Sequence, residues 1–366
     1  MRILNVMQCT NLGGMEQASL RLMAGLSRSG HSCSVLSLNP VGALGPLLQQ
    51  NGIAAQGINY RGKGGWLSIG ELRKKLRSYE ADALIMTGHN LLAMSVLGQV
   101  ETKKRLLAMH FHHTGVKPQW QWKLIYRAAC RKFDCITYPS DFIRREAITL
   151  YPAVERMSAT VRNPLQVPDL PSEADRREAR HTLGLPMKGP VVGNAGWLIP
   201  RKRFDVFLNT ARLIAQAVPD ATFVIAGDGP QRQELMRLAI TLGIGQRVKW
   251  LGWMSDISPL YKSLDALLFN SDWDAFPTAP LEAMSYGVPV AASVINGGLR
   301  EVISDDRYGF VFGTHDADSL AGAVVRCLED PRRRVGMQGR ERVSRLCNFE
   351  QCVTRVESLL VGNNGP

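Results

Sequence analysis

The sequence alternates short apolar runs with longer amphipathic segments, and it does so twice along the chain. Residues 2–8, RILNVMQ, have the composition of a buried strand, and residues 31–38, HSCSVLSL, have that of a second. Between them, residues 13–30 repeat apolar side chains at helical spacing and end at Gly30. A strand, a helix and a strand in this order predict a β-α-β unit with two parallel strands in one sheet.

Further strands are predicted in the first half at 81–88, 105–111 and 134–140. Residues 161–180 contain three prolines followed by charged residues, which is typical of a linker that leads into a helix. The alternation then restarts. Strands are expected at 189–196, 221–228, 247–252, 265–271 and 288–293, with helices between them at 204–218, 231–243, 257–264 and 280–287.

A chain of 366 residues is too long for one ordinary core and suits two domains. The predicted fold class is therefore α/β, with two tandem doubly wound, Rossmann-like domains. We expect a first domain at 1–165, a second at 166–348, and a C-terminal helix near 349–366 that packs back on the first. Such a pair faces each other across a cleft between the carboxyl ends of the two sheets, where α/β proteins bind ligands.

Composition excludes several classes. No window approaches the roughly 18 uninterrupted apolar residues that a membrane span needs, and residues 1–9 continue into a strand instead of a cleavable signal. We therefore expect a cytoplasmic protein. The seven cysteines contain no C-x-x-C pair, so neither a disulfide framework nor a zinc site is predicted. His110, His112 and His113 lie close together, but no carboxylate or cysteine is spaced to complete a metal site.

The excess of positive charge is confined to the first half. Residues 1–165 contain 21 Lys and Arg against 9 Asp and Glu, whereas residues 166–366 contain 23 of each. One cluster, residues 116–133, interleaves Trp120 and Trp122 with cations. This pattern favours an anionic partner, such as a membrane surface or a phosphorylated acceptor, while nucleic acid is not expected because the chain carries no motif for it. The alternative is that both tryptophans are internal and the cations serve solubility.

Residues 274–290, DAFPTAPLEAMSYGVPV, place an acid at each end of a short segment that leads into a helix. Asp274 and Glu282 are separated by seven residues. One interpretation is that Glu282 caps its own helix and Asp274 is a solvated loop acid. The other is that both line a pocket for a sugar nucleotide.

Several segments of the sequence resemble those of a known protein family, and this resemblance favours the second interpretation. The second half contains, in order, FVIAGDGPQRQEL, VKWLGWMSDISPLYKSLDALLFNS, DAFPTAPLEAMSYGVPVAAS and NGGLREVI. The first half contains GGMEQASLRLMAGLSRSGHSCSVLSL. Together these segments resemble glycosyltransferase family 4, retaining enzymes of the GT-B fold, over nearly the whole chain. The resemblance implies transfer of a sugar, with retention of configuration, from a nucleotide-sugar donor.

In this family the two acids line the donor site. The resemblance implies that Asp274 accepts hydrogen bonds from sugar hydroxyls and that Glu282 accepts them from the ribose, tasks that suit charged acceptors. The family usually has Glu at the first position. Asp retracts the carboxylate by roughly 1.5 Å, which alters the sugar that is held. The other residues expected at the donor in this segment are Phe276, Pro277, Thr278 and Leu281.

Residues 196–205, GWLIPRKRFD, align with the family segment that supplies two cations to the diphosphate. Lys202 occupies the lysine position. Trp197 stands where the family has arginine, and an indole cannot neutralise a phosphate. We expect Arg201 or Arg203 to reach inward instead; the alternative for both is a surface cluster at a helix start.

The remaining assignments follow the same alignment. His110 matches the family histidine that lies over the donor sugar, with His112 as the second choice. Gly252 and Trp253 match the turn that holds the nucleobase, which fits uracil and leaves adenine and guanine open. Near the N-terminus, Gly14 is assigned to the donor, and Gly13, Glu16 and His112 to the acceptor side. From the residues alone, the two glycines equally suit a tight strand-to-helix turn.

We expect no cofactor and no metal. The acids of D-W-D at 272–274 resemble an Asp-x-Asp metal motif, but they lie in the donor segment, and GT-B enzymes use cations and helix dipoles instead. The predicted donor is a UDP-sugar, and the acceptor is a saccharide, a lipid-linked sugar or another glycoconjugate at the inner face of the membrane. Two alternatives stay open: a GT-B isomerase of sugar nucleotides, and a catalytically weak sugar-nucleotide-binding protein, which Trp197 motivates.

Overall fold

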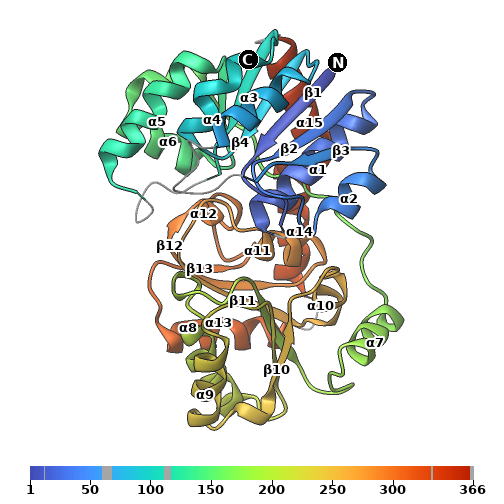
Figure 1. Cartoon of the computed structure of the whole chain (residues 1–366). Coiled ribbons are helices and arrows are strands. Elements are labelled where there is room, and N and C mark those ends of the chain that lie inside the picture. The colour runs from blue at the N-terminus through green and yellow to red at the C-terminus, as the bar shows by residue number, and fades with distance from the viewer. Residues whose placement is uncertain (12, 60–67, 111–116, 331–332, 363–366) are drawn as a thin grey trace. The chain divides into compact units, whose positions relative to one another are not determined.

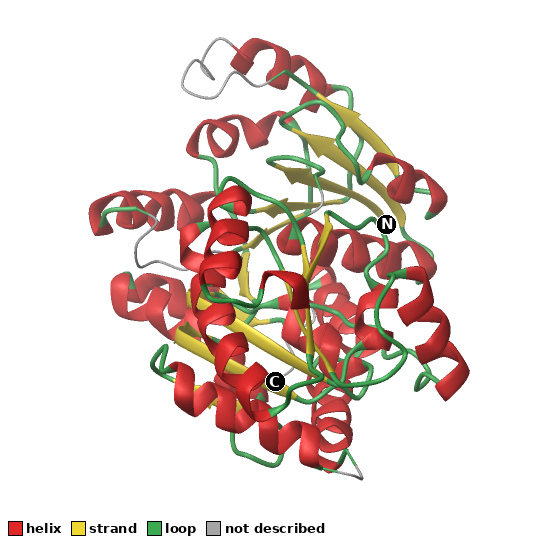
Figure 2. Ribbon diagram, turned by 90° about the horizontal axis from the view of Figure 1, so that it is seen from below, coloured by secondary structure: helices red, strands yellow, loops and turns green. Residues whose placement is uncertain are grey.

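The computed structural model describes residues 1–11, 13–59, 68–110, 117–330 and 333–362. The chain divides into two compact units. Met1–Leu165 and Cys347–Pro366 form the first, and Gln166–Leu346 forms the second. Each unit contains one parallel sheet flanked by helices (Figures 1 and 2). The predicted α/β architecture with two Rossmann-like domains is confirmed.

Seven parallel strands form the sheet of the first unit, in the order β3-β2-β1-β4-β5-β6-β7. They are β1 (Arg2–Met7), β2 (Ser32–Ser37), β3 (Ala54–Gly57), β4 (Ala83–Thr87), β5 (Lys104–Ala108), β6 (Cys135–Tyr138) and β7 (Ser158–Thr160). The order reverses between β1 and β4. In open α/β sheets this switch point is where ligands approach the carboxyl ends of the strands.

The helices of the first unit come from both ends of the chain. They are α1 (Gly14–Arg28), α2 (Gly45–Gln50), α3 (Ile69–Arg77), α4 (Leu91–Val96), α5 (Gln119–Lys132), α6 (Asp141–Leu150) and α15 (Phe349–Val361), with 3-10 turns η2 (Leu97–Gln99) and η3 (Pro152–Met157). Val353 and Val356 of α15 share one apolar core with Met23 and Leu26 of α1. The last helix thus completes the first unit.

Six parallel strands form the sheet of the second unit, in the order β10-β9-β8-β11-β12-β13. They are β8 (Val191–Ala195), β9 (Thr222–Ala226), β10 (Val248–Gly252), β11 (Ala266–Asp274), β12 (Val290–Gly297) and β13 (Phe310–Phe312). The helices are α7 (Glu173–Thr182), α8 (Phe204–Ala217), α9 (Arg232–Thr241), α10 (Ser258–Ser263), α11 (Thr278–Ser285), α12 (Leu299–Val302), α13 (Ala317–Glu329) and α14 (Arg334–Leu346). The switch point lies between β8 and β11.

One carboxylate ties three segments of the second unit together. Asp265, just before β11, accepts hydrogen bonds from Arg176 at 2.7 Å, Arg180 at 2.6 Å and Arg333 at 2.7 Å. The backbone N–H of Val191 donates to the same carboxylate at 2.8 Å. Asp265 therefore fastens α7 and the segment before α14 to the start of β8 and β11.

β11 is longer than the sequence predicts. The predicted strand ends at residue 271, whereas β11 continues to Asp274 because β12 runs beside it, with Trp273 paired to Asn296 and Asp274 to Gly297. A side chain at Gly297 would overlap the backbone of Asp274, so glycine permits this close pairing. Asp274 is the last residue of a strand, and its position is set by the sheet.

Candidate active site

Several predicted donor-site residues lie at the switch point of the second unit. After β8 the chain forms the 3-10 turn η4 (Pro200–Lys202), and after β11 it enters α11. The Lys202 ammonium forms an ion pair with the Asp274 carboxylate, and both side chains are largely buried. The structure thus brings together two residues that are 72 positions apart.

Arg201 also faces Asp274. Its guanidinium lies 3.7 Å from Asp274 Oδ2 and 4.4 Å from the centre of the Trp273 ring, and it donates a hydrogen bond of 3.2 Å to the Trp273 carbonyl. A guanidinium that stacks on an indole keeps its charge while its orientation is fixed. Two cations, Arg201 and Lys202, therefore converge on one carboxylate.

Arg203 points to a different pair of acids. Its backbone is left-handed, with φ of 45°, and it ends η4 and begins α8. The guanidinium donates to both oxygens of Asp205, at 3.0 and 2.8 Å, and to Asp272 at 3.3 Å. Asp272 and Asp274 are alternate residues of β11, so their side chains point to the same face of the sheet. On that face Asp272 pairs with Arg203 and Asp274 pairs with Lys202.

A buried hydrogen-bond chain continues behind Asp272. His315, between β13 and α13, has Nε2 at 2.9 Å from Asp272 and Nδ1 at 2.7 Å from the Ser293 hydroxyl. Asn270 in turn donates to Ser293 at 2.8 Å. Asp272 is thus linked through His315 and Ser293 to Asn270.

Burial changes the acid–base chemistry of Lys202. Removal from water disfavours the ammonium and lowers the pKa of Lys202 below its ordinary value of 10.5. Asp274 opposes this effect, and Arg201 adds to it through like-charge repulsion. Lys202 is therefore a cation held in a poorly solvated site, where its interaction with a developing negative charge is stronger than in water.

Glu282 is buried on α11, with 7% of its surface exposed. The Tyr261 hydroxyl donates to its Oε2 at 2.9 Å. The helix begins at Thr278, two residues before the predicted start, after the N-cap Pro277. The helix therefore starts four residues after Asp274. The side chains of Phe276 and Leu281 in this segment are buried.

Three loops lie next to one another at the carboxyl ends of β8, β9 and β10. The N–H of Leu198 donates to the Asp228 carbonyl at 2.9 Å, and that of Gly227 donates to the Gly252 carbonyl at 2.7 Å. Gly252 is left-handed, with φ of 69°. Trp197 and Trp253, on the two outer loops, are 57% and 46% exposed. Trp197 is thus not packed in the core.

The first unit holds the remaining candidates. Gly13 is the N-cap of α1, which begins at Gly14, and Cys9 Sγ lies 3.3 Å from a carboxylate oxygen of Glu16. Burial raises the pKa of Glu16. His110 follows β5; it is half-buried, and desolvation lowers its pKa to about 4, so the ring is neutral at pH 7. His112 lies outside the described residues.

Family models match both halves. Residues 12–164 match the glycosyltransferase family 4 model, and residues 175–342 match the model of glycosyl transferases group 1. The chain belongs to the family 4 glycosyltransferases. The predicted family is thereby confirmed, and the enzyme class is glycosyltransferase.

Characterised relatives of this glycosyltransferase cover parts of the chain. A UDP-Gal:alpha-D-GlcNAc-diphosphoundecaprenol alpha-1,3-galactosyltransferase of Escherichia coli is 31% identical over 180 residues, which are 48% of this chain and 46% of that protein. A GDP-mannose-dependent alpha-(1-6)-phosphatidylinositol monomannoside mannosyltransferase of Mycolicibacterium smegmatis is 29% identical over 251 residues, 64% and 63% of the two chains. The matched segments span about half and just under two thirds of these relatives.

The fold of this glycosyltransferase is shared over its whole length with a solved structure. The crystal structure of HepE from Anabaena in complex with UDP and glucose superposes with a TM-score of 0.85 and 21% identity, covering 99% of this chain and 100% of that one. This likeness establishes the GT-B fold.

The structure adds residues that the sequence did not single out. Tyr261 contacts Glu282, and His315 contacts Asp272. Tyr261 lies in a predicted helix and His315 in an unassigned segment, so neither carried a local signal. They are identified only by their close contacts with Glu282 and Asp272 in the folded structure.

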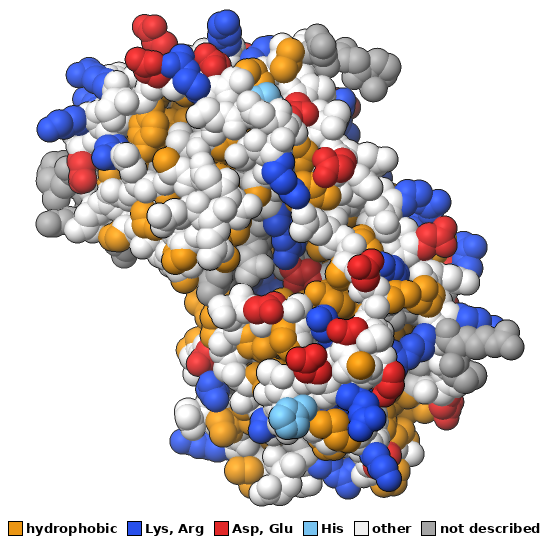
Figure 3. Space-filling model, turned by 90° about the vertical axis from the view of Figure 1, so that its right-hand side faces the viewer, with side chains coloured by type: hydrophobic (Ala, Val, Ile, Leu, Met, Phe, Trp, Pro, Cys, Tyr) orange, Lys and Arg blue, Asp and Glu red, His pale blue; other side chains and the backbone are white. Residues whose placement is uncertain are grey.

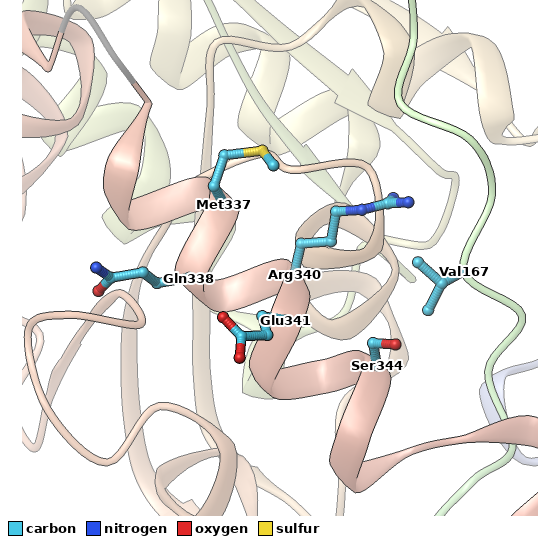
Figure 4. A pocket seen from close by; sticks show the side chains of 6 residues that line it. All are labelled: Val167, Met337, Gln338, Arg340, Glu341 and Ser344. Atoms are coloured by element: carbon cyan, nitrogen blue, oxygen red, sulfur yellow. The ribbon is translucent and has the colours of Figure 1, made fainter.

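One further feature of the glycosyltransferase lies apart from these residues. A cavity of about 320 Å³ in the second unit lies between α14 and Val167 (Figure 4). None of the predicted site residues lines it. Among the described residues, no three His, Cys, Asp or Glu side chains are grouped as metal ligands. No helix in the described ranges is long and apolar enough to cross a bilayer.

Proposed function

We propose that this protein is a retaining glycosyltransferase that moves a hexose from a nucleotide sugar to a saccharide, lipid-linked or related glycoconjugate acceptor. The observation that carries the proposal is the meeting of Lys202, Arg201 and Asp274, the last of which lies four residues before α11 in the chain. Cations and helix amides at one point form a receptor for a diphosphate. The adjacent carboxylate is an acceptor for sugar hydroxyls.

Each group then has a task at the donor. Lys202 and Arg201 hold the diphosphate together with the first amides of α11. Asp274 accepts from the hexose, and the buried carboxylate of Glu282 accepts from the ribose. Gly252 and Trp253 bound the nucleobase. The family resemblance further assigns Gly14 and His110 of the first unit to the donor, and Gly13, Glu16 and His112 to the acceptor.

The proposed donor is a UDP-hexose. The name of the Escherichia coli relative specifies UDP-Gal, and the HepE crystal contains UDP and glucose, which support uracil. The mycobacterial relative is named as GDP-mannose-dependent, so guanine is the main competitor. Both relatives are named for acceptors that carry a lipid and a phosphate, which supports an acceptor of that class.

The proposed mechanism is same-face substitution without a metal ion. The bond from the anomeric carbon to the diphosphate oxygen breaks, and the acceptor oxygen bonds to that carbon from the same face. The acceptor proton passes to the departing diphosphate. Lys202 and Arg201 stabilise the negative charge that develops there, since charged donors placed in advance are the largest contributors to such steps.

A donor panel tests the proposal. Thermal shift with UDP-, GDP- and ADP-sugars should select one base, because a ligand that binds the native state raises its melting temperature. With that donor, Lys202→Ala should lower kcat by about 10- to 1000-fold. NMR of the product should show a retained anomeric configuration, and excess EDTA should leave activity unchanged. An inverted product, or activity restored only by magnesium, would refute the mechanism.

A further inference from the structure

Helix α5 divides its tryptophans between the core and the surface. Trp122 and Tyr126 are fully buried and anchor the helix, whereas Trp120 is 61% exposed and Leu124 is 46% exposed. The sequence left open whether both tryptophans are internal. Only Trp122 is internal. Trp120 and Leu124 therefore project from a helix whose opposite face is packed in the core; α5 lies beside α4 and α6 (Figure 1).

Cations occupy the same exposed face. Lys123, Arg127 and Arg131 are exposed and recur with Trp120 and Leu124 at spacings of three and four residues, which places them along one stripe. Lys132 adds a fourth exposed cation. α5 contains no acidic residue. The stripe, Trp120, Lys123, Leu124, Arg127 and Arg131, is thus both apolar and strongly basic.

These cations differ from the arginines of the second unit. Arg176, Arg180 and Arg203 each pair with a carboxylate. Figure 3 shows positive and negative side chains interspersed on the face of the second unit that it presents. Within the described residues, the cations of the α5 stripe have no such ion pair.

Neighbouring elements do not compensate the stripe. α6 and η3 contribute equal numbers of acids and bases: Asp141, Glu146 and Glu155 against Arg144, Arg145 and Arg156. α4 contributes no charge, and its Leu91 is 43% exposed. The excess charge of this region therefore comes from α5, and further apolar surface lies on the helix next to it.

We infer that the α5 stripe is a docking surface for an anionic lipid bilayer. Lys and Arg in this setting are attracted to anionic headgroups, and Trp settles at headgroup depth. The stripe extends about 16 Å along the helix, because about eleven rises of 1.5 Å separate Trp120 from Arg131. A soluble phosphorylated acceptor would need a concave site, and it would have no use for an exposed Trp and Leu between the cations.

The inference goes beyond the proposed transfer reaction and does not depend on it. It names the surface that holds the enzyme near a lipid-linked acceptor. Because binding to vesicles is measured without donor or acceptor, a failure here leaves the donor-site proposal intact, and the reverse also holds.

Vesicle co-sedimentation of the full chain tests the inference. Wild-type protein should bind vesicles of phosphatidylglycerol and phosphatidylcholine, bind pure phosphatidylcholine much less, and be released near 0.5 M salt, where screening acts within a few ångströms. Lys123→Gln/Arg127→Gln/Arg131→Gln should lose on the order of 100-fold in partitioning, given three headgroup attractions removed.

α3 supplies a matched control. Arg73→Gln/Lys74→Gln/Lys75→Gln removes three charges from the same unit, on a helix whose buried side chains are Leu72 and Leu76 and which exposes no aromatic residue. This variant should retain most of the binding.

Trp120→Phe isolates the aromatic anchor. Brominated lipids quench indoles that reach the acyl boundary, so wild-type fluorescence should fall with these lipids, and the fall should be lost in Trp120→Phe. Equal losses of binding in the α3 and α5 variants would reduce the effect to net charge and overturn the inference. Absence of wild-type binding to anionic vesicles, or unchanged quenching in Trp120→Phe, would overturn it as well.

Discussion

At the scale of single residues, the Lys202–Asp274 pair explains how the charged groups of the proposed donor site would be held in place before a ligand binds. A poorly solvated carboxylate is stabilised by nearby cations, and the cations are held by it in turn. A bound diphosphate would compete for Lys202 and Arg201. The Asp274 carboxylate would then be released to accept from the sugar hydroxyls, so on this proposal the ion pair is the ligand-free form of two binding groups.

The two acids should separate in a binding experiment. Glu282→Ala should weaken UDP binding at least tenfold, because the ribose is its proposed partner. Asp274→Ala should leave UDP binding within a fewfold of wild type and impair hexose transfer. Calorimetry with UDP alone measures both effects. The assignment is wrong if Asp274→Ala loses UDP binding and Glu282→Ala keeps it.

Arg201 should matter more than Arg203 for turnover. Arg201 faces Asp274, whereas Arg203 is held by Asp205 and Asp272. We expect Arg201→Ala to lower kcat by about 10- to 100-fold, as loss of one charged stabiliser does.

Moving the arginine from position 201 to position 197 gives a second test of this prediction. Adding Trp197→Arg to Arg201→Ala should restore part of kcat, since it introduces the arginine that the resemblance to the family implies at position 197. Adding it to Arg203→Ala should not. Equal kcat for the two single variants would contradict the distinction.

Activity should fall at alkaline pH because of Lys202. Burial lowers its pKa below 10.5, so its charge is lost at a lower pH than that of an exposed lysine. The pH profile of kcat should have an alkaline limb with a pKa below 10.5. In Lys202→Arg this limb should disappear, since a guanidinium stays protonated. A limb that persists unchanged in Lys202→Arg assigns it to another group.

At the scale of elements, β11 and the η4 turn decide the geometry of the site. Asp272 and Asp274 alternate along one strand and hold consecutive residues of one turn, Arg203 and Lys202. The left-handed backbone of Arg203 makes this possible, because it lets the chain turn directly from η4 into α8.

The sequence predicted β8, β9, β11 and β12 because these strands contain buried, near-continuous apolar runs. β10 was predicted from its place in the alternation of strands and helices, since only Val248 of this strand is buried. The sequence did not predict β3, β7 or β13. These strands have four, three and three residues, three of the four in β3 are exposed and none in β7 is buried, so they lack a buried apolar run. The contact between Asp272 and His315 could not be predicted from the sequence either. It joins residues 43 positions apart, whose contact only the sheet order creates.

Asp265 should be a stability residue of the second unit. Asp265→Ala would leave Arg176 and Arg180, both largely buried, without their carboxylate. Removing one member of a buried ion pair costs about 3 kcal/mol or more. Urea unfolding should report this loss, and UDP affinity of the folded protein should change little. Asp305→Ala, which removes an exposed partner of Arg307, is the control and should leave stability near that of wild type.

At the scale of the whole molecule, the first unit closes only when the end of the chain returns to it. α15 contributes Phe349, Val353, Val356 and Leu360 to the core that α1 begins. The contact is close. A Cβ at Gly25 of α1 would overlap Val353 Cγ2 and touch the Phe349 ring. The sequence predicted a C-terminal helix there, but the fit of Gly25 against Val353 depends on packing that no local pattern encodes.

Replacing glycine by alanine should therefore have opposite effects on stability at one helical position in each unit. Gly322, in the interior of α13, is exposed and has no atom near its missing Cβ, so Gly322→Ala should stabilise the second unit by up to about 1 kcal/mol through helix propensity. Gly25→Ala gains the same propensity but overpacks the contact with Val353, a fault that costs about 1–3 kcal/mol, so the first unit should be destabilised. Hydrogen exchange read by mass spectrometry assigns each change to its unit: protection should fall in α1 and α15 for Gly25→Ala and stay at the wild-type level there for Gly322→Ala. Stabilisation of the first unit by Gly25→Ala would mean that α15 does not lie against α1 as described.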